Sequence, residues 1–226
     1  MIKFWTVKVI RFVTIFFVLS FFIAVYFYHG GNIHDPSQLG YSFTHNFLSD
    51  LGGIESHSGN DNFFSSILFN LSMLLFFLSG ISFLFVPLLF KEDKITFAFA
   101  IIGSFFFFIG SCFFAGVGLT PYDLYLDLHI FFALNSFRLL IPASILYLIV
   151  FLRSPLEKRY SVVIALFLFL TTSYVFYQLF GGNPLENKDI MINQAIIQKI
   201  IVFLSVISMF SLSYGFSKRI DQLNLS

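Results

Sequence analysis

The chain has 226 residues, of which 58% are hydrophobic and only 11% are charged, and its mean hydropathy is +0.87. A soluble domain carries about 25% charged residues, so this composition excludes an ordinary soluble fold and indicates an integral membrane protein. The net charge is +1, and the single cysteine, Cys112, excludes an intramolecular disulfide and a cluster of thiolate metal ligands. We expect the lipid bilayer as a partner and no nucleic acid.

Six apolar stretches are long enough to cross a bilayer, which takes about 20 helical residues. They lie at residues 9–28, 63–90, 95–117, 128–152, 160–180 and 194–216. The first is too long for a signal peptide and no small-x-small cleavage site follows it, so we expect it to be retained. The predicted fold class is all-α, a polytopic membrane protein with a single six-helix transmembrane domain over residues 1–226.

Basic residues predict the orientation, because cytoplasmic loops of membrane proteins are enriched in Lys and Arg. Ten of the 13 basic residues precede, follow or connect the spans on one side: Lys3, Lys8, Arg11, Lys91, Lys94, Arg153, Lys158, Arg159, Lys218 and Arg219. Only Lys188 falls in a loop on the other side. We therefore expect a multi-pass protein of the cytoplasmic (plasma) membrane, the cell inner membrane, with both termini inside.

Most of the acids and all of the histidines fall on the predicted outer side. The histidines are His29, His34, His45, His57 and His129, and the acids are Asp35, Asp50, Glu55, Asp61, Asp123, Asp127, Glu186 and Asp189. The inner loops are short turns with basic residues. The sequence therefore places any functional site at the outer face.

The first outer loop, residues 29–62, is the longest connection, and a gap of this size is usually functional or disordered. We predict a short helix within it, capped by Thr44 and stopped by Gly52. Such a helix would place His45 with Ser49, and Asn46 with Asp50, at i,i+4 spacing. An amphipathic loop helix without a function is the alternative.

Asn62 follows as the predicted cap of the second span. Ser66 and Asn70 then share one face of that span. Polar residues at that depth normally point into the bundle and bond to a neighbouring helix.

The stretch 116–138 joins two apolar segments and carries unusually many polar groups. Thr120 is a suitable N-cap, Pro121 suits the first helical position, and Asp123 sits where a capping-box acid reaches back. In one helix, Asp123 and Asp127 would share a face, and Arg138 would return close to it. A helix cap alone explains the first three residues but does not explain Asp127 or Arg138.

Two cations fall within spans, where ionised groups normally face protein or water and have a partner. Arg138 lies about ten residues into its helix, roughly 15 Å from the start. Its expected partner is a carboxylate of the first outer loop or a substrate anion, and a purely structural ion pair is equally consistent with the sequence. Lys199 follows Gln198 near the outer surface, where it could snorkel or face the same outer cavity as Asp50 and Asp127.

Several short motifs in a fixed order resemble those of a known family. They are His45-Asn-Phe-Leu-Ser-Asp-Leu-Gly52, Asn70, Ala115-Gly-Val-Gly-Leu-Thr-Pro-Tyr-Asp123, His129 and Gln198-Lys199. Together they resemble the uncharacterised membrane proteins of the domain-of-unknown-function 998 family, over nearly the whole chain. Members typically carry a Gln-Arg pair where this chain has Gln198-Lys199, which keeps the charge but loses the planar fork. The resemblance implies a six-helix bundle and supplies no activity.

The predicted function is an outward-facing Asp/His/Arg polar site that binds or processes a lipid-like or small amphipathic ligand. The candidate catalytic residues are Asp50, Asp123 and His129, because carboxylates and histidines perform acid–base and metal-assisted chemistry. The candidate binding residues are His45, Asn46, Ser49, Asn70, Asp127, Arg138, Gln198 and Lys199. A metal such as zinc would use His45, Asp50, Asp123 and His129.

Other classes of protein stay open at this point, and so does the question of whether the protein is an enzyme. A metal-dependent membrane hydrolase, by loose analogy with alkaline ceramidases, would need histidines after His129, and none exists. An exosortase-type transpeptidase, suggested by Cys112 and Arg138, lacks its later histidine for the same reason. A small-solute or proton-coupled transporter without an internal repeat would function as a homodimer. A structural or sensor subunit would use the polar groups only to hold helices together.

Overall fold

The computed structural model describes residues 1–225, and 76% of the chain is helical. Within those residues, six helices are long and apolar enough to cross a membrane. They are α1 (Ile10–Phe27), α2 (Phe63–Phe85), α3 (Lys94–Leu119), α4 (Leu126–Arg153), α5 (Lys158–Phe180) and α6 (Lys188–Gln222). A π-helical segment at Phe4–Val9 precedes α1, and a 3₁₀ helix at Val86–Leu89 continues α2. The predicted all-α, six-helix membrane fold is confirmed.

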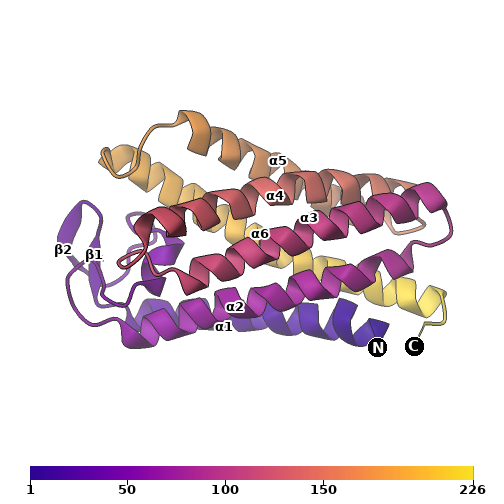
Figure 1. The fold of residues 1–226 in the computed structure, drawn as a ribbon, viewed down its shortest axis with the longest axis horizontal. Coiled ribbons are helices and arrows are strands. Elements are labelled where there is room, and N and C mark those ends of the chain that lie inside the picture. Colours follow the sequence, from indigo (N-terminus) through magenta and orange to yellow (C-terminus); the bar gives the residue numbers. More distant parts are fainter. Residues whose placement is uncertain (226) are drawn as a thin grey trace.

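Each helix packs on its neighbour in sequence, and α6 closes the ring against α1 (Figure 1). Both termini lie at one end of the bundle, called the terminal end below, where Lys3 Nζ lies 3.2 Å from Asp221 Oδ1. The opposite end, called the loop end, carries residues 28–62 and the turns at residues 120–125 and 181–187. Any site built from the long loop therefore lies at the loop end.

Apolar side chains fill the bundle along its length. Phe83, Phe151 and Phe216 belong to the cluster at the terminal end, and Leu51 and Phe69 belong to the cluster at the loop end. Many large apolar side chains instead point out of the bundle, among them Phe12, Phe22, Phe105, Phe131 and Phe169. Exposed apolar rings along all of the helices match an environment of lipid tails. Lipid tails are as apolar as these side chains, so exposing the side chains to lipid is not unfavourable.

The long loop contains a small hairpin and a 3₁₀ helix. Strand β1 (Gly30–Asn32) pairs antiparallel with β2 (Asp35–Leu39), and the 3₁₀ helix η2 spans Leu48–Gly52. The predicted cap at Thr44 is wrong: its hydroxyl bonds to His45 Nδ1, 2.7 Å away, and η2 begins after Phe47. The later start follows from Asp50, whose Oδ2 accepts the Phe47 N–H at 2.9 Å.

Helix α4 begins later than the Thr-Pro-Tyr-Asp sequence predicts. The Thr120 hydroxyl donates to the Gly116 carbonyl at 2.8 Å, so Thr120 ends α3 and does not cap α4. Asp123 Oδ2 accepts the Glu55 N–H at 2.9 Å, which ties the turn to the long loop. Asp123 and Asp127 therefore do not share a helical face, because α4 starts at Leu126.

The start of α2 also differs from the prediction in its use of Asn62. Its Nδ2 donates to the carbonyls of Leu51, at 3.2 Å, and Gly53, at 3.0 Å, and its side chain makes no capping bond. Ser66 and Asn70 do share a face of α2, since Asn70 Nδ2 donates to Ser66 Oγ at 3.0 Å. The first two turns of α2 thus hold the end of η2 by its carbonyls.

Glycines let α3 approach α2, and this close approach provides a test of the packing. A methyl group on Gly118 would lie 2.7 Å from the Asn70 carbonyl oxygen and 2.8 Å from Met73 Cβ, whereas on Gly110 its nearest neighbour would be Leu139 Cβ at 3.4 Å. Because the Gly118 clash involves backbone, we expect Gly118→Ala to lower the free energy of unfolding by about 1–3 kcal/mol.

Gly110→Ala on the same helix is the matched control. Alanine favours helix over glycine by about 1 kcal/mol, so this variant should be neutral or slightly stabilised. Denaturation of the purified protein in mixed micelles measures both. Equal stability of the two variants would contradict the close packing of α2 and α3 at Gly118.

Candidate functional site

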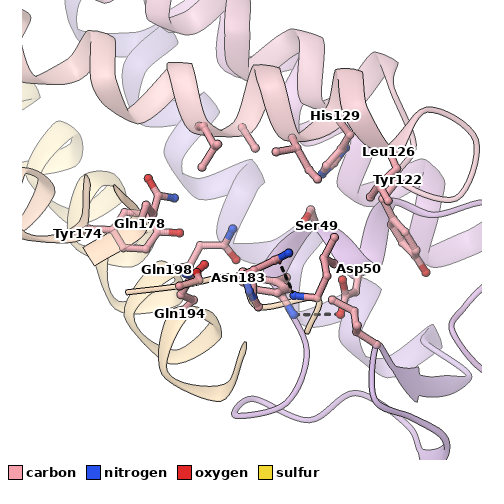
Figure 2. A pocket seen from close by; sticks show the side chains of 18 of the residues that line it. Ser49, Asp50, Tyr122, Leu126, His129, Tyr174, Gln178, Asn183, Gln194 and Gln198 are labelled. Atoms are coloured by element: carbon pink, nitrogen blue, oxygen red, sulfur yellow. Dashed lines mark hydrogen bonds between the residues drawn. The ribbon is translucent and has the colours of Figure 1, made fainter. Parts of the chain in front are cut away.

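A cavity of about 590 Å³ opens at the loop end between α4, the α5–α6 turn and the long loop (Figure 2). This volume lies within the range of about 300–1,000 Å³ that is usual for small-molecule sites. Its polar lining residues are Ser49, Asp50, His57, Tyr122, His129, Tyr174, Gln178, Asn183, Gln194 and Gln198. Its apolar lining residues are Ile33, Phe47, Leu126, Ile130, Ala133, Leu134, Leu179, Pro184 and Leu185.

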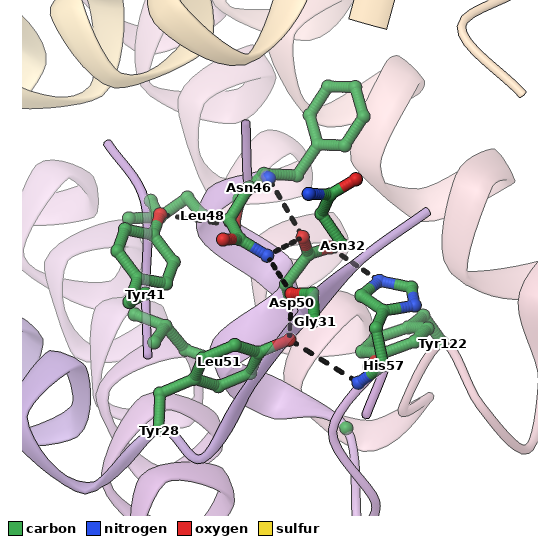
Figure 3. Close-up of polar contacts among 12 residues, drawn as sticks. Tyr28, Gly31, Asn32, Tyr41, Asn46, Leu48, Asp50, Leu51, His57 and Tyr122 are labelled. Carbon is green, nitrogen blue, oxygen red and sulfur yellow. Dashed lines mark hydrogen bonds and ion pairs between the residues drawn. The ribbon is translucent and has the colours of Figure 1, made fainter. Parts of the chain in front are cut away.

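Asp50 is the buried acid of the cavity, with only 4% of its surface exposed. Its Oδ2 accepts hydrogen bonds from the Phe47 backbone N–H and from Asn46 Nδ2, at 2.9 and 3.0 Å. Its Oδ1 lies 3.4 Å from His57 Nε2 (Figure 3). One oxygen of Asp50 therefore holds the loop, and the other faces a histidine.

His57 reaches Asp50 from the far end of the same loop. Its ring stacks on Tyr122, with centroids 4.7 Å apart and an interplanar angle of 28°. The Tyr122 hydroxyl donates to the Glu55 carbonyl at 3.1 Å, which fixes the aromatic ring under the histidine. The loop and the turn before α4 thus hold His57 in place.

Three tyrosines surround this part of the loop and remain phenols. Burial raises the pKa of Tyr28, Tyr41 and Tyr122, and the negative charge of Asp50 raises each pKa further. The Tyr28 hydroxyl donates to the Gly31 carbonyl at 3.2 Å, and the Tyr41 hydroxyl donates to the Phe47 carbonyl at 3.1 Å. These bonds brace the loop around Asp50.

Asn46 connects Asp50 to the rest of the loop. Its Nδ2 also donates to the Gly31 carbonyl at 2.8 Å, and its Oδ1 accepts from the Ser42 N–H at 2.9 Å and from Gln38 Nε2 at 2.7 Å. One fully buried amide thus joins the hairpin, the turn at Ser42 and the 3₁₀ helix.

Helix α6 anchors the loop through two consecutive residues. Gln198 Oε1 accepts the Leu48 N–H at 2.8 Å, and Lys199 Nζ donates to the carbonyls of Asn46 and Ala195. Lys199 is fully buried and lies against the rings of Tyr41 and Phe43, so it does not snorkel. A buried ammonium needs such partners, because an unpaired charge would be strongly destabilising.

His129 projects from the first turn of α4 toward the cavity (Figure 2). Its Nδ1 lies 2.6 Å from the Thr120 carbonyl oxygen, which can only accept, so Nδ1 carries the proton. In the neutral ring Nε2 is then an unprotonated acceptor, and within residues 1–225 it has no hydrogen-bond partner. The residue is 5% exposed, so a buried lone pair faces the cavity.

The wall opposite α4 comes from both sides of the α5–α6 turn. Gln194 Nε2 donates to the Gly182 carbonyl at 3.3 Å, and Gln178 Oε1 is buried without a partner among the described residues. His34 Nε2 and the Pro184 carbonyl lie 2.9 Å apart, which joins the β hairpin to this turn. The cavity is therefore enclosed by segments from both halves of the chain.

The structure brings several of the predicted site residues together. Asp50, Ser49, His129 and Gln198 line the cavity. Asn46 and Lys199 bond behind it, and Asn70 supports the loop by donating to the Gly52 carbonyl at 2.9 Å. Asn46 and Asp50 bond to each other, as their i,i+4 spacing predicts, although the chain there forms the 3₁₀ helix η2 and not an α-helix.

Four other predicted residues do not line the cavity: His45, Asp123, Asp127 and Arg138. His45 bonds to its neighbours in the loop, Asp123 bonds to the Glu55 N–H, and Asp127 is exposed at the start of α4. Arg138 Nη1 donates to Asn135 Oδ1 at 3.3 Å, and the described residues give it no carboxylate within salt-bridge distance. The expected pairing of Arg138 with an acid of the long loop is wrong.

The proposed metal ligands do not form a metal site. Over residues 1–225, no group of three or more His, Cys, Asp or Glu side chains is arranged to hold an ion. Of His45, Asp50, Asp123 and His129, only Asp50 and His129 share the cavity, so this set does not fit the tetrahedral site that zinc requires.

Six polar residues of the cavity were not identified as site residues from the sequence: His57, Tyr122, Tyr174, Gln178, Asn183 and Gln194. The two glutamines flank Gly181-Gly-Asn-Pro184, and a polar residue on each side of a turn between apolar spans is a usable signal. His57 begins the turn that carries the chain back from Glu55 to Asp61, in which Gly59 has a φ of 77°. Only the fold shows that His57 returns to Asp50.

Chemically, the cavity combines a carboxylate–histidine pair with a second, neutral histidine. Such groups bind hydroxyl or amine donors, and they can move protons because histidine titrates near neutral pH. Apolar side chains line the same cavity, four of them from α4 and one, Leu179, from α5. The site therefore suits a ligand with one polar end and one apolar end.

Comparisons with known proteins found no match: no protein-family model, no curated protein and no solved structure matches this chain.

The anchoring of the loop on α6 can be tested by Lys199→Met. Hydrogen bonds to charged groups contribute about 1.5–3 kcal/mol, so the change should release residues 42–50 and speed their amide exchange by about tenfold or more. Hydrogen-exchange mass spectrometry measures this directly.

Lys188→Met, which makes the same substitution at an exposed position of α6, is the control and should leave the loop protected. Unchanged exchange of residues 42–50 in Lys199→Met would show that the lysine does not hold the loop.

Proposed function

We propose that this integral membrane protein binds a lipid-like or small amphipathic ligand in the cavity at its loop end. The polar head of the ligand lies against Asp50, His57 and His129, and its apolar part lies between α4 and α5. The observation that carries the proposal is the buried Nε2 of His129, which has no partner among residues 1–225 and belongs to an α4 wall that is otherwise apolar. An unpartnered buried polar atom is unfavourable unless a ligand or water completes it.

The orientation is part of the proposal. The ten basic residues of the N-terminus, the C-terminus and the connections between α2 and α3 and between α4 and α5 gather at the terminal end. By the positive-inside rule this end faces the cytoplasm, so the cavity opens on the outer side of the plasma membrane.

Membership of the domain-of-unknown-function 998 family is also proposed. The residues that carry the resemblance support it, because they gather in one region: Asn46, Asp50, Asn70, His129 and Lys199 all belong to the loop end or its anchors. Shared motifs would then mark the same site across the family.

A second candidate is acid–base chemistry on the same ligand. His129 Nε2 is available to accept a proton, and Asp50 lies beside His57 Nε2. An enzyme of this kind would turn over its ligand, and His129→Ala would abolish turnover while leaving the protein folded.

The binding proposal is tested by mass spectrometry of lipids that copurify with the protein. His129→Ala removes the buried acceptor, and a lost hydrogen bond to a buried group costs about 1–3 kcal/mol, so occupancy should fall about tenfold. Ala133→Phe places a ring in the apolar part of the cavity and should displace the ligand.

The controls are His45→Ala and Leu128→Phe, which introduce the same residues outside the cavity and should retain the lipid. A ligand retained by both cavity variants, or lost equally in the controls, would refute binding at this site.

The orientation is tested by thiol labelling in a Cys112→Ser background. Asn60 is exposed at the loop end and Asn224 is exposed at the terminal end. A membrane-impermeant maleimide should label Asn60→Cys in intact cells and Asn224→Cys only after permeabilisation. The reverse pattern would overturn the proposed orientation.

A further inference from the structure

We infer that the cavity selects an amphiphile whose headgroup is neutral or cationic and donates hydrogen bonds, such as a hydroxyl or amine head, over one that carries phosphate or carboxylate. This inference rests on the proposed function, since it names the class of ligand for the same site. The headgroup preference follows from the distribution of charge, because an acid lines the cavity and no lysine or arginine does.

Asp50 is the one acid among the described residues that line the cavity, and no lysine or arginine lines it. The histidine beside this acid faces it, since His57 Nε2 lies 3.4 Å from Asp50 Oδ1. The polar end of the cavity thus carries a negative or zero charge. An anionic head placed there would meet a like charge in a poorly solvated site, which disfavours binding strongly.

Lys199, which anchors the loop that carries Asp50, is committed to other groups. Lys199 Nζ bonds to the carbonyls of Asn46 and Ala195 and packs on the rings of Tyr41 and Phe43. The Asn46 residue stands between it and Asp50. The ammonium therefore stabilises the loop and is not presented to a ligand.

Arg138 does not supply the missing charge either. It lies in α4 beyond the last cavity residue of that helix, Leu134, and bonds to Asn135. The position of Arg138 thus does not support a substrate anion as its partner. A phosphate or carboxylate would enter the cavity without a cationic partner among the lining residues.

The free polar atoms instead include acceptors. His129 Nε2 offers a lone pair, Asp50 Oδ1 carries negative charge, and Gln178 Oε1 is buried without a partner among the described residues. A head with two or more O–H or N–H groups could satisfy them together. Buried acceptors discriminate strongly in favour of donors, because a ligand without them leaves each acceptor unpaired.

The test uses four ligands that share one oleoyl chain or its oleyl equivalent and differ in the head: oleylamine, monooleoylglycerol, oleate and oleoyl-lysophosphatidate. Native mass spectrometry of the full chain in detergent measures their relative binding. We expect the amine and the glycerol ester to bind at least about tenfold more tightly than the two anions. A difference of this size corresponds to the loss of one charge-assisted contact.

Two variants connect the preference to the cavity. Asp50→Asn should lower the affinity for oleylamine about tenfold while monooleoylglycerol is affected less, and Asp127→Asn, outside the cavity, should change neither. Gln178→Lys, which adds a cation to the lining without altering Asp50, should raise the affinity for oleate. This second variant keeps the test decisive if Asp50→Asn fails to fold.

The outcomes separate the inference from the function on which it rests. Tighter binding of oleate or lysophosphatidate that Ala133→Phe abolishes would overturn the headgroup preference and leave the cavity as the binding site. Binding of all four ligands that Ala133→Phe leaves unchanged, or no binding of any, would overturn the proposed function as well.

Discussion

The buried Asp50 carboxylate is the group around which the loop end is arranged. It accepts from Asn46 Nδ2 and from the Phe47 N–H, while the Asn46 carbonyl accepts from the fully buried Lys199. One residue therefore touches a buried anion with its side chain and a buried cation with its backbone. Each charge costs free energy to remove from water, and each is compensated by dipoles fixed in the loop. Loss of either charge would leave polar groups of the loop without partners.

This arrangement also explains why the cavity lies where it does. Lys199 and Gln198 hold the loop against α6, and Asn70 and Asn62 hold it against α2. The loop thus covers one side of the loop end, and the remaining space lies toward α4 and the α5–α6 turn. A rigid loop keeps Asp50 and His57 in place opposite His129, and preorganised polar groups of this kind bind a ligand with less loss of conformational freedom.

The helices could be predicted closely from the sequence, because hydrophobic length is a strong signal in a membrane protein. The predicted spans and the observed helices differ by a few residues, most at α6, which runs from Lys188 to Gln222. Local signals at loops were weaker. Thr120 and Asn62 are residue types that favour N-caps, yet the Thr120 side chain bonds back to Gly116 of α3 and the Asn62 side chain bonds to Leu51 of η2. Asp50 and His129 were identifiable as polar residues beside apolar spans, whereas the contact between Asp50 and His57 depends on how the loop turns back, which residue types do not specify.

The bonds between the loop and α6 have a consequence for how the chain is made. Asn46 and Lys199 are 153 positions apart, and Leu48 and Gln198 are 150 apart. Chains form their structure from the N-terminus as they emerge during synthesis. The loop is therefore synthesised long before Gln198 and Lys199, and its bonds to them can form only after the sixth helix has been made. A chain that ends before α6 would leave the Asn46 carbonyl and the Leu48 N–H without their partners, which gives a quality-control system a way to recognise unfinished molecules.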